Sequence, residues 1–224
     1  MKKVLIAGGT GLVGGQVVTE LVNLRNTQLV MLVRRLSEQV PRSVKQVVVD
    51  YDLGPEGLKH ALSNEAFDVL ICAIGTTMRT AGSKQAFTKI DYDIPMSLLT
   101  YASALAVKPK FVFVSSLGAD QPYGFYLETK HAVEKEIFAS KLRYVIARPS
   151  LLLGDRTERR LGEAVAQKLM PIFFNGLVPT PLSKTQWYKR YRPVTASAVA
   201  KSIVAEVYAE RGADSLILEG DDFG

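Results

Sequence analysis

Tyr126, Lys130 and Ser116 are the side chains whose types and spacing suit them to catalysis. Tyr126 and Lys130 are four residues apart, so on a helix they lie on one face, one turn apart. A lysine ammonium at that separation favours the phenolate form of a tyrosine, which is otherwise a poor acid or base at neutral pH. The hydroxyl of Ser116 can donate a hydrogen bond to a carbonyl oxygen on which charge develops. Together these groups predict general acid/base catalysis on a carbonyl that receives hydride, or on the corresponding alcohol.

The position of this set along the chain supports the prediction. Phe111 to Val114 is an apolar strand pattern that ends at Ser115-Ser116, and Tyr126 opens the helical segment that follows. No other tyrosine of the sequence is followed by a lysine four residues later. The alternative is an ordinary surface pair, because a tyrosine and a lysine at this spacing also arise by chance.

A glycine-rich turn at the amino terminus predicts the cofactor site that such catalysis needs. Val4 to Ala7 is an apolar strand pattern, and Gln16 to Val22 can form a helix with one apolar face. Between them lie Gly8, Gly11 and Gly14. Strand, glycine turn and helix is the context of a dinucleotide-binding loop, in which the amino terminus of the helix faces the pyrophosphate. An ordinary strand-to-helix turn is the alternative.

Arg34 and Arg35 end the second predicted strand, Leu29 to Val33. In a dinucleotide-binding unit this position meets the adenosine ribose, where an acidic residue would accept hydrogen bonds from the 2′-hydroxyl of NAD. Guanidinium groups pair instead with a 2′-phosphate, so the two arginines favour NADPH over NADH. A solvated strand end is the alternative.

Two further strand ends are expected to line the cofactor. Asp50 follows the strand Val44 to Val49 and is a candidate to hold the adenine amino group, although capping of the next helix is an equal alternative. Ile74 and Gly75 follow the strand Val69 to Ala73, where the backbone would pass the ribose and nicotinamide end of the cofactor.

Strand and helix patterns alternate along the whole chain. This alternation predicts an α/β fold with a Rossmann-type doubly wound parallel sheet. The last two strands are expected at Arg143 to Ala147 and at Ser215 to Leu218. We expect one NAD(P)-binding domain over residues 1–224, with a small C-terminal substrate cap within about residues 154–192.

Three other segments have a pattern of their own. Gln85 to Ala106 is helical in pattern, and Pro95 should bend or restart that helix. Pro193 opens a further helix that runs to about Ala209. The basic piece Met78 to Lys84 is expected to be a flexible loop.

The composition narrows the classes of function. The 224 residues carry a net charge of +6, but the basic residues are scattered without aromatic interleaving, which does not favour nucleic acid. The single cysteine, Cys72, is expected in the core, and it fits a reducing, cytoplasmic location. No stretch reaches the length of a membrane span. His60 and His131 are expected at solvated helix positions, and no metal site is expected.

Several motifs resemble the atypical and extended short-chain dehydrogenase/reductases over nearly the whole chain. They are Gly8 to Gly14, Ser115-Ser116, Tyr126 with Lys130, Arg148 to Gly154, and Pro193 to Ala200. The subgroup around the Tat-interacting oxidoreductase and its small bacterial relatives is similar in three stretches, Cys72 to Thr77, Val114 to Asp120 and Leu153 to Arg156. The resemblance implies a Rossmann fold, NADPH binding and Tyr126 as the general acid/base. It also implies a set of residues that contact the cofactor or line its site: Thr10, Gly11, Leu12, Val13, Arg34, Arg35, Ile74, Gly75, Tyr126, Lys130, Leu152 and Arg160.

One position departs from the commoner reductases of this family. Many of them carry an asparagine on the helix after the fourth strand, where it supports a proton relay, and Asp91 occupies the matching position here. A carboxylate can hold a water but cannot donate as an amide does, which puts that relay in doubt.

Three functions stay open from the sequence. The first is NADPH-dependent reduction of a small carbonyl substrate, with an apolar wall and an anion-binding pair supplied by Phe173, Phe174, Trp187, Tyr188, Arg190 and Arg192. The second is a redox sensor or scaffold that binds NADPH without turnover and presents a surface to a protein partner. The third is a nucleotide-sugar epimerase or dehydratase, which needs a larger pocket than the small cap allows. The sequence identifies neither the substrate nor whether the chain is a monomer or a homodimer.

Overall fold

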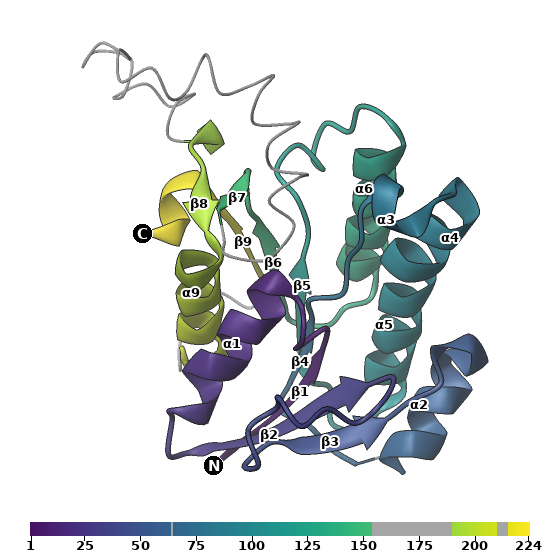
Figure 1. Cartoon of the computed structure of the whole chain (residues 1–224), viewed down its shortest axis with the longest axis vertical. Coiled ribbons are helices and arrows are strands. Elements are labelled where there is room, and N and C mark those ends of the chain that lie inside the picture. The colour runs from purple at the N-terminus through teal and green to yellow at the C-terminus, as the bar shows by residue number, and fades with distance from the viewer. Residues whose placement is uncertain (64, 154–189, 210–214) are drawn as a thin grey trace.

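A parallel sheet of seven strands forms the centre of the described chain (Figure 1). The computed structural model describes residues 1–63, 65–153, 190–209 and 215–224. The strand order is β3-β2-β1-β4-β5-β6-β9, and every neighbouring pair is parallel. The strands are β1 (Lys2–Ala7), β2 (Thr27–Val33), β3 (Lys45–Val48), β4 (Val69–Cys72), β5 (Lys110–Val114), β6 (Tyr144–Arg148) and β9 (Ser215–Glu219). This order confirms the predicted doubly wound sheet, and its direction reverses between β1 and β4, where ligands of such sheets bind at the carboxyl ends of the strands.

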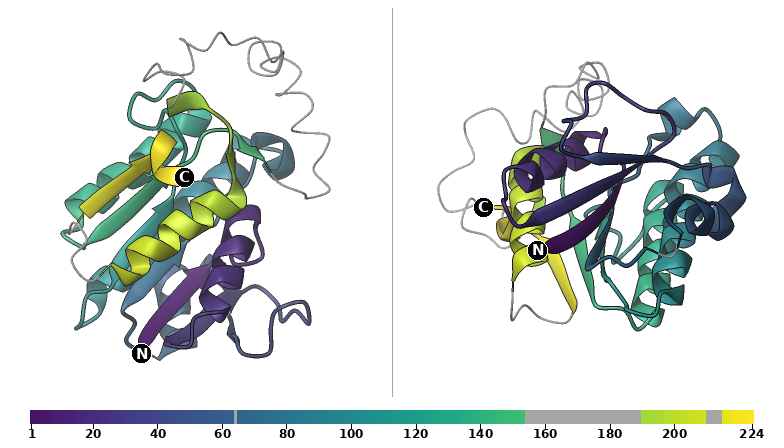
Figure 2. Two further views of the ribbon diagram at one scale, coloured as in Figure 1. Left: turned by 90° about the vertical axis from the view of Figure 1, so that its left-hand side faces the viewer. Right: turned by 90° about the horizontal axis from the view of Figure 1, so that it is seen from below.

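Helices cover both faces of the sheet. One face carries α1 (Leu12–Val22) and α9 (Ala196–Tyr208), which lie side by side in both Figure 1 and Figure 2. The other face carries α2 (Gly54–Leu62), α5 (Ile94–Ala104) and α6 (Phe125–Ala139). Because both faces are covered, the central strands are apolar on both sides, as parallel sheets require.

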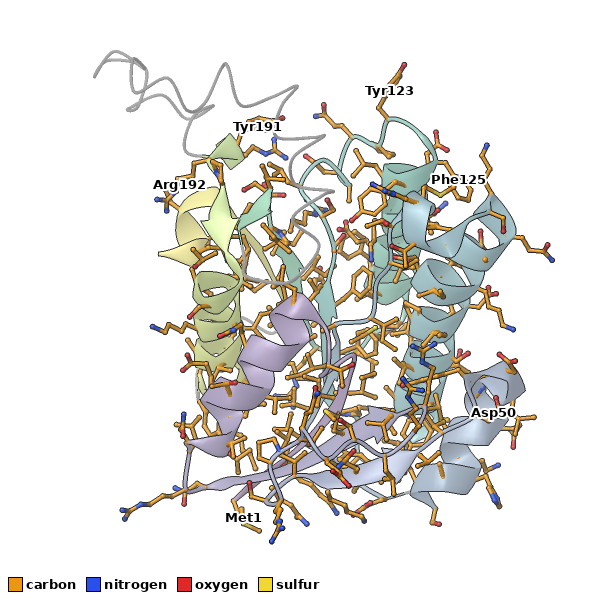
Figure 3. The ribbon with its side chains drawn as sticks, in the orientation of Figure 1. Met1, Asp50, Tyr123, Phe125, Tyr191 and Arg192 are labelled. Atoms are coloured by element: carbon orange, nitrogen blue, oxygen red, sulfur yellow. The ribbon has the colours of Figure 1, made fainter. Side chains whose placement is uncertain are left out.

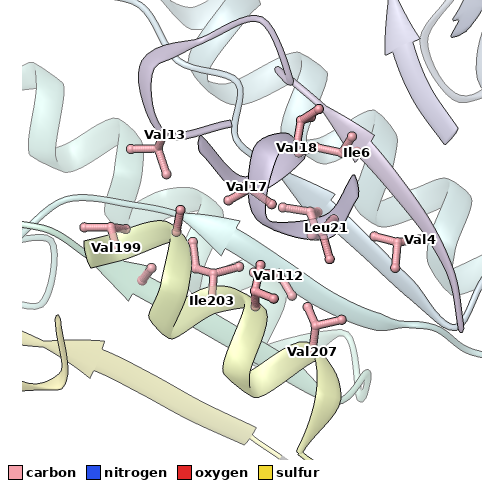
Figure 4. Close-up of a cluster of buried hydrophobic side chains, with 14 of the residues drawn as sticks. Val4, Ile6, Val13, Val17, Val18, Leu21, Val112, Val199, Ile203 and Val207 are labelled. Atoms are coloured by element: carbon pink, nitrogen blue, oxygen red, sulfur yellow. The ribbon is translucent and has the colours of Figure 1, made fainter. Parts of the chain in front are cut away.

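The contact between α1 and α9 comes from side chains at helical spacing. Val13, Val17 and Leu21 of α1 are buried against the sheet, and so are α9 side chains at Val199, Ile203 and Val207 (Figure 4). Residues four apart lie on one face of a helix, so each series forms a continuous apolar stripe. This packing fixes α1, and with it the glycine turn at its amino terminus.

The segment before β5 differs from the helix that the sequence predicted. It divides into α4 (Lys84–Thr88), a π-helical turn η2 (Lys89–Asp93) and α5, which carries Pro95 in its first turn. Proline has no N–H to donate to the carbonyl four residues before it, so the regular ladder cannot continue through this point. The predicted restart is confirmed, and the helix widens into a π turn just before the proline.

Two local predictions were wrong. Met78 to Ala81, expected to be part of a flexible loop, forms the short helix α3 (Met78–Ala81), whose first turn Thr77 caps by accepting from the N–H of Thr80. A helix was expected from Pro193, but β8 (Val194–Thr195) comes first and pairs with β7 (Leu152–Leu153). Helix α9 then begins at Ala196, because the Thr195 hydroxyl caps it through the N–H of Ala198.

The predicted cap lies outside the described residues except at its end, residues 190–192. The cap and the single-domain boundary 1–224 therefore stay predictions. In the part of the chain that the structure describes, no helix combines the length and the apolar character needed to cross a membrane.

Candidate cofactor and catalytic site

The glycine turn closes tightly against the end of β4. Gly8 has φ +87°, and a Cβ there would come within 2.5 Å of the Ala73 carbonyl group. A Cβ on Gly14 would overlap the carbonyl oxygen of Gly8. The Gly11 N–H donates to that same oxygen at 2.9 Å. The turn is therefore shaped by backbone contacts that side chains at Gly8 and Gly14 would prevent.

The amino terminus of α1 is arranged for an anion. Gly11 occupies the N-cap position, so no side chain there accepts hydrogen bonds from the first turn, and the first turn contains no acidic residue. The N–H groups of a first helical turn have no partner within the helix, and they bind phosphate groups well. Of the predicted contacts, Thr10 is exposed, Leu12 is half-buried and Val13 is buried. The residues present thus fit the pyrophosphate of a dinucleotide.

Arg34 and Asp50 follow the neighbouring strands β2 and β3. Arg34 and Arg35 are exposed, which leaves their guanidinium groups accessible. Asp50 is also exposed, and its carboxylate accepts a hydrogen bond from the N–H of Asp52 at 2.9 Å. It therefore caps the short 3-10 turn Tyr51–Leu53 and not the helix near Pro55 that the sequence suggested, since the N-cap of α2 is Leu53. Figure 3 shows Asp50 beside α2, well apart from Tyr123 and Phe125 at the start of α6. Burial raises the pKa of Tyr51, and the charge of Arg34 opposes that rise.

The loop after β4 joins the glycine turn to the catalytic candidates. Its first residue, Ala73, packs against Gly8, and an ideal Cβ on Gly75 would lie 3.4 Å from Asp91 Oδ1 and 3.6 Å from Lys130 Nζ. The Thr76 N–H donates to Asp91 Oδ2 at 2.8 Å. Cys72, at the end of β4, is buried, and burial raises the pKa of its thiol to about 11. Cys72 is therefore a core residue, as predicted. Its thiol stays protonated, and a protonated thiol is a poor nucleophile.

Lys130 and Asp91 form a buried ion pair. The Lys130 Nζ lies 2.9 Å from Asp91 Oδ1, and the two side chains are 4% and 0% exposed. Burial is the largest influence on the pKa of Lys130 and would lower it, but the charge and hydrogen bond of Asp91, together with the charges of Tyr126 and Cys72, raise the pKa on balance. The Phe113 ring lies 5.1 Å below the same ammonium. The lysine is thus held in place by groups from two other elements, η2 and β5.

Tyr126 lies one turn before Lys130 and remains accessible. Its side chain is 38% exposed. Its ring packs against Phe87 of α4 at 5.8 Å between centroids, and Phe87 also contacts Phe125. The Lys84 ammonium lies over the Phe125 ring at 5.1 Å. The phenol is therefore oriented by an aromatic cluster while its face toward solvent stays open.

The two serines after β5 have different surroundings. Ser115 is buried and donates its hydroxyl to Glu134. Ser116 is only partly buried, and its hydroxyl makes a long contact of 3.5 Å to the carbonyl of Leu117. Ser116 is therefore the more accessible of the two serines, and its role in binding a substrate carbonyl stays a prediction.

The sequence did not predict a buried polar network below the site. Arg148 donates to Glu134 Oε1 at 2.9 Å and to Glu219 Oε1 at 2.7 Å, and Glu134 is fully buried. Glu134 follows Tyr126 and Lys130 at the same four-residue spacing along α6. A carboxylate on the inward face of a helix requires a partner. The four-residue spacing that places Glu134 on the same face as Lys130 was therefore the sequence signal from which a buried ion pair could have been predicted.

The remaining site predictions have mixed outcomes. Leu152 lies in β7 and is partly buried. Arg190 pairs with Asp120 and Glu219, and Arg192 lies 3.6 Å from Asp221, so both guanidinium groups already have partners in the chain. Their expected role in binding an anionic substrate gains no support. Four predicted wall residues and one predicted cofactor contact lie outside the described residues: Phe173, Phe174, Trp187, Tyr188 and Arg160.

The two histidines, expected at solvated helix positions, differ from each other. His60 in α2 is exposed as predicted. His131 in α6 is partly buried, and its Nδ1 lies 2.7 Å from the carbonyl oxygen of Ala119. His131 therefore helps to fix the loop after β5 rather than facing solvent.

Comparison with known proteins agrees with this geometry. A family profile described as NAD(P)H-binding matches residues 8–169. The chain is 34% identical to Protein HTATIP2 of Rattus norvegicus, over 79% of this chain and 72% of that protein. It is 31% identical to Protein FMP52, mitochondrial, of Candida albicans, over 97% of this chain and 94% of that protein.

Solved structures share the fold. The oxidoreductase ylbE of Lactococcus lactis superposes with a TM-score of 0.69 at 21% identity, covering 96% of this chain and 88% of that one. UDP-glucose 4-epimerase of Thermotoga maritima superposes with a TM-score of 0.70 at 17% identity, covering 97% and 76%. At such identities these likenesses concern the fold alone. Because the Candida albicans relative is named as mitochondrial, a cytoplasmic location for this chain stays a prediction.

Proposed function

We propose that this chain, which belongs to the NAD(P)H-binding family and is an oxidoreductase of the short-chain dehydrogenase/reductase type, reduces a small carbonyl substrate with NADPH. One observation carries the proposal. The glycine turn, the loop after β4 and the Lys130–Asp91 pair contact one another in series, and Tyr126 lies one turn from that pair. A cofactor-binding turn and an acid/base pair thus occupy the same edge of the sheet.

Each residue has a role that follows from its surroundings. The first turn of α1 binds the pyrophosphate, and Arg34 and Arg35 bind the 2′-phosphate. NADPH supplies the hydride. Ser116 donates a hydrogen bond to the substrate carbonyl oxygen, and Tyr126 donates the proton that converts this oxygen to a hydroxyl. Lys130 stabilises the phenolate that Tyr126 leaves behind.

The test of this function is NADPH oxidation, followed at the absorbance of the reduced nicotinamide, against a panel of aldehydes, ketones and quinones. We expect turnover with NADPH, and slower turnover with NADH at equal concentration. Tight NADPH binding without turnover of any substrate would favour the sensor or scaffold instead. Interconversion of nucleotide sugars without net cofactor oxidation would favour the epimerase.

Cofactor preference depends on Arg34 in this proposal. Replacement of Arg34 by alanine is expected to raise KM for NADPH by about 10-fold to 100-fold, since a charged hydrogen bond contributes roughly 1.5–3 kcal/mol. KM for NADH should change little, because NADH has no 2′-phosphate. Arg25 is a matched control, as it is an exposed arginine that precedes β2 at the opposite edge of the sheet. Equal effects of Arg34→Ala on both cofactors would contradict the assignment.

A further inference from the structure

Asp91 combines full burial with a negative charge at the centre of the proposed site. Its carboxylate is 0% exposed, and one oxygen contacts the Lys130 ammonium at 2.9 Å. The other oxygen accepts the Thr76 N–H at 2.8 Å. A buried carboxylate is costly unless it is paired, so this arrangement must be specific. Nothing in the acid/base chemistry assigned to Tyr126, Lys130 and Ser116 accounts for it.

We propose that Asp91 is a positioning residue, the counter-ion that holds the Lys130 ammonium beside Tyr126 and ties it to the loop after β4. The inference rests on the reductase function proposed above. Asp91 acts through Lys130 and does not itself contact the reacting atoms. Asp91 lies at the position where the resemblance leads us to expect the asparagine of the proton relay. An asparagine there would donate a hydrogen bond through its amide, whereas Asp91 supplies a negative charge to Lys130.

The surroundings of Lys130 show why a counter-ion is required. The titratable groups that act on it in the described chain are Asp91 from η2, Tyr126 from its own helix and the Cys72 thiol from β4. The Phe113 ring from β5 covers the ammonium at 5.1 Å. Burial in such a place favours the neutral amine, and Asp91 makes the largest contribution among the groups that reverse this preference.

The π turn explains how Asp91 reaches this position. Asp91 is the buried residue of η2, whereas the residues at the two ends of this turn, Lys89 and Asp93, are exposed. A π turn adds a residue to the helical turn and so changes the direction of the side chains within it. The N–H of Ile94 accordingly bonds to the carbonyl of Lys89, five residues earlier. This local widening lies directly between α4, which carries Phe87, and α5.

The charge state of Lys130 tests the inference without any substrate. Protein labelled with 13C at the lysine ε position would be titrated by NMR, with Lys130→Met identifying the signal. In the wild type, Lys130 should remain protonated at least to its ordinary pKa of 10.5. In Asp91→Asn, its titration midpoint should fall by more than about one pH unit, because a buried ammonium has then lost its partner.

Turnover gives the second readout. The raised pKa of Lys130 keeps this side chain charged until high pH. In Asp91→Asn the pKa falls and Lys130 loses its charge at a lower pH, so the alkaline limb of the kcat/KM profile should move to lower pH. Glu65→Gln is a matched control. It also removes the carboxylate that pairs with a lysine, in this case Lys3, but at the opposite end of the strands. That variant should keep the wild-type profile.

The outcomes separate this inference from the proposed function. An Lys130 midpoint that is equal in wild type and Asp91→Asn overturns the inference, as does an alkaline limb that stays in place while the Lys130 midpoint falls. Should Asp91→Asn fail to fold, the wild-type titration decides alone, and a neutral Lys130 below pH 9 overturns it. Failure of the reductase proposal appears in a different measurement, as an absence of NADPH oxidation by the wild type, and failure of the acid/base assignment appears as full activity in Tyr126→Phe.

Discussion

Replacement of Tyr126 by phenylalanine is expected to lower kcat for carbonyl reduction by about 10²-fold to 10⁴-fold, the usual contribution of a positioned acid or base. The substitution removes only the hydroxyl. The ring should keep its contact with Phe87, because phenylalanine presents the same face at the same position. KM for NADPH should change little, since the loss concerns the proton and leaves the cofactor contacts intact. Steady-state kinetics with wild type and variant side by side measure both quantities.

Tyr123 provides the control for this experiment. It lies three residues before Tyr126, it is 92% exposed, and Figure 3 shows it projecting from the loop before α6. Tyr123→Phe removes an equivalent hydroxyl and should leave kcat unchanged. A Tyr126→Phe variant as active as the wild type would disprove the acid/base assignment. Loss of activity together with loss of NADPH binding would indicate damage to the cofactor site instead.

Replacement of Glu134 by glutamine is expected to destabilise the fold by about 3 kcal/mol, toward the lower end of the range for breaking a buried ion pair. The amide keeps the size of the side chain but removes the charge that faces the buried Arg148. Glu219 remains as a second partner of Arg148, which limits the loss. Each kcal/mol shifts Tm by roughly 2–4 °C in a chain of this size, so Tm should fall by about 6–12 °C.

Glu136 is the matched control for Glu134. It lies on the same helix α6 but is exposed, so Glu136→Gln should change the stability by less than about 0.5 kcal/mol. Thermal unfolding followed by circular dichroism compares the two variants. An equally small effect at Glu134 would show that the network of Ser115, Arg148 and Glu219 does not depend on the charge of Glu134.

The strand positions were predictable because each strand is a short apolar run. The predicted strands agree with the observed ones to within two residues, and β4 was expected at Val69 to Ala73 and observed at Val69–Cys72. Strands buried on both faces must be apolar throughout, which makes their signal local. The glycine turn was local too, since Gly8 and Gly14 follow directly on β1.

The irregular elements were harder to predict. Met78 to Ala81 has the composition of a loop, and it forms a helix because Thr77 supplies a cap. Pro95 indicated a break, but the type of break depends on how Asp91 and Phe87 pack against α6. The pairing of β7 with β8 joins residues some forty positions apart, and two-residue strands leave no pattern in the sequence.

The sequence by itself determined the order of strands and helices, the glycine turn and the pairing of Tyr126 with Lys130, because each depends on neighbours within a few residues. The tertiary structure decided which partners the buried charges have. Asp91 meets Lys130, and Arg148 meets both Glu134 and Glu219, across separations of 14 to 71 residues in the chain. These contacts exist because a charge removed from water must be met by an opposite charge, and only the packed fold determines which one lies within reach.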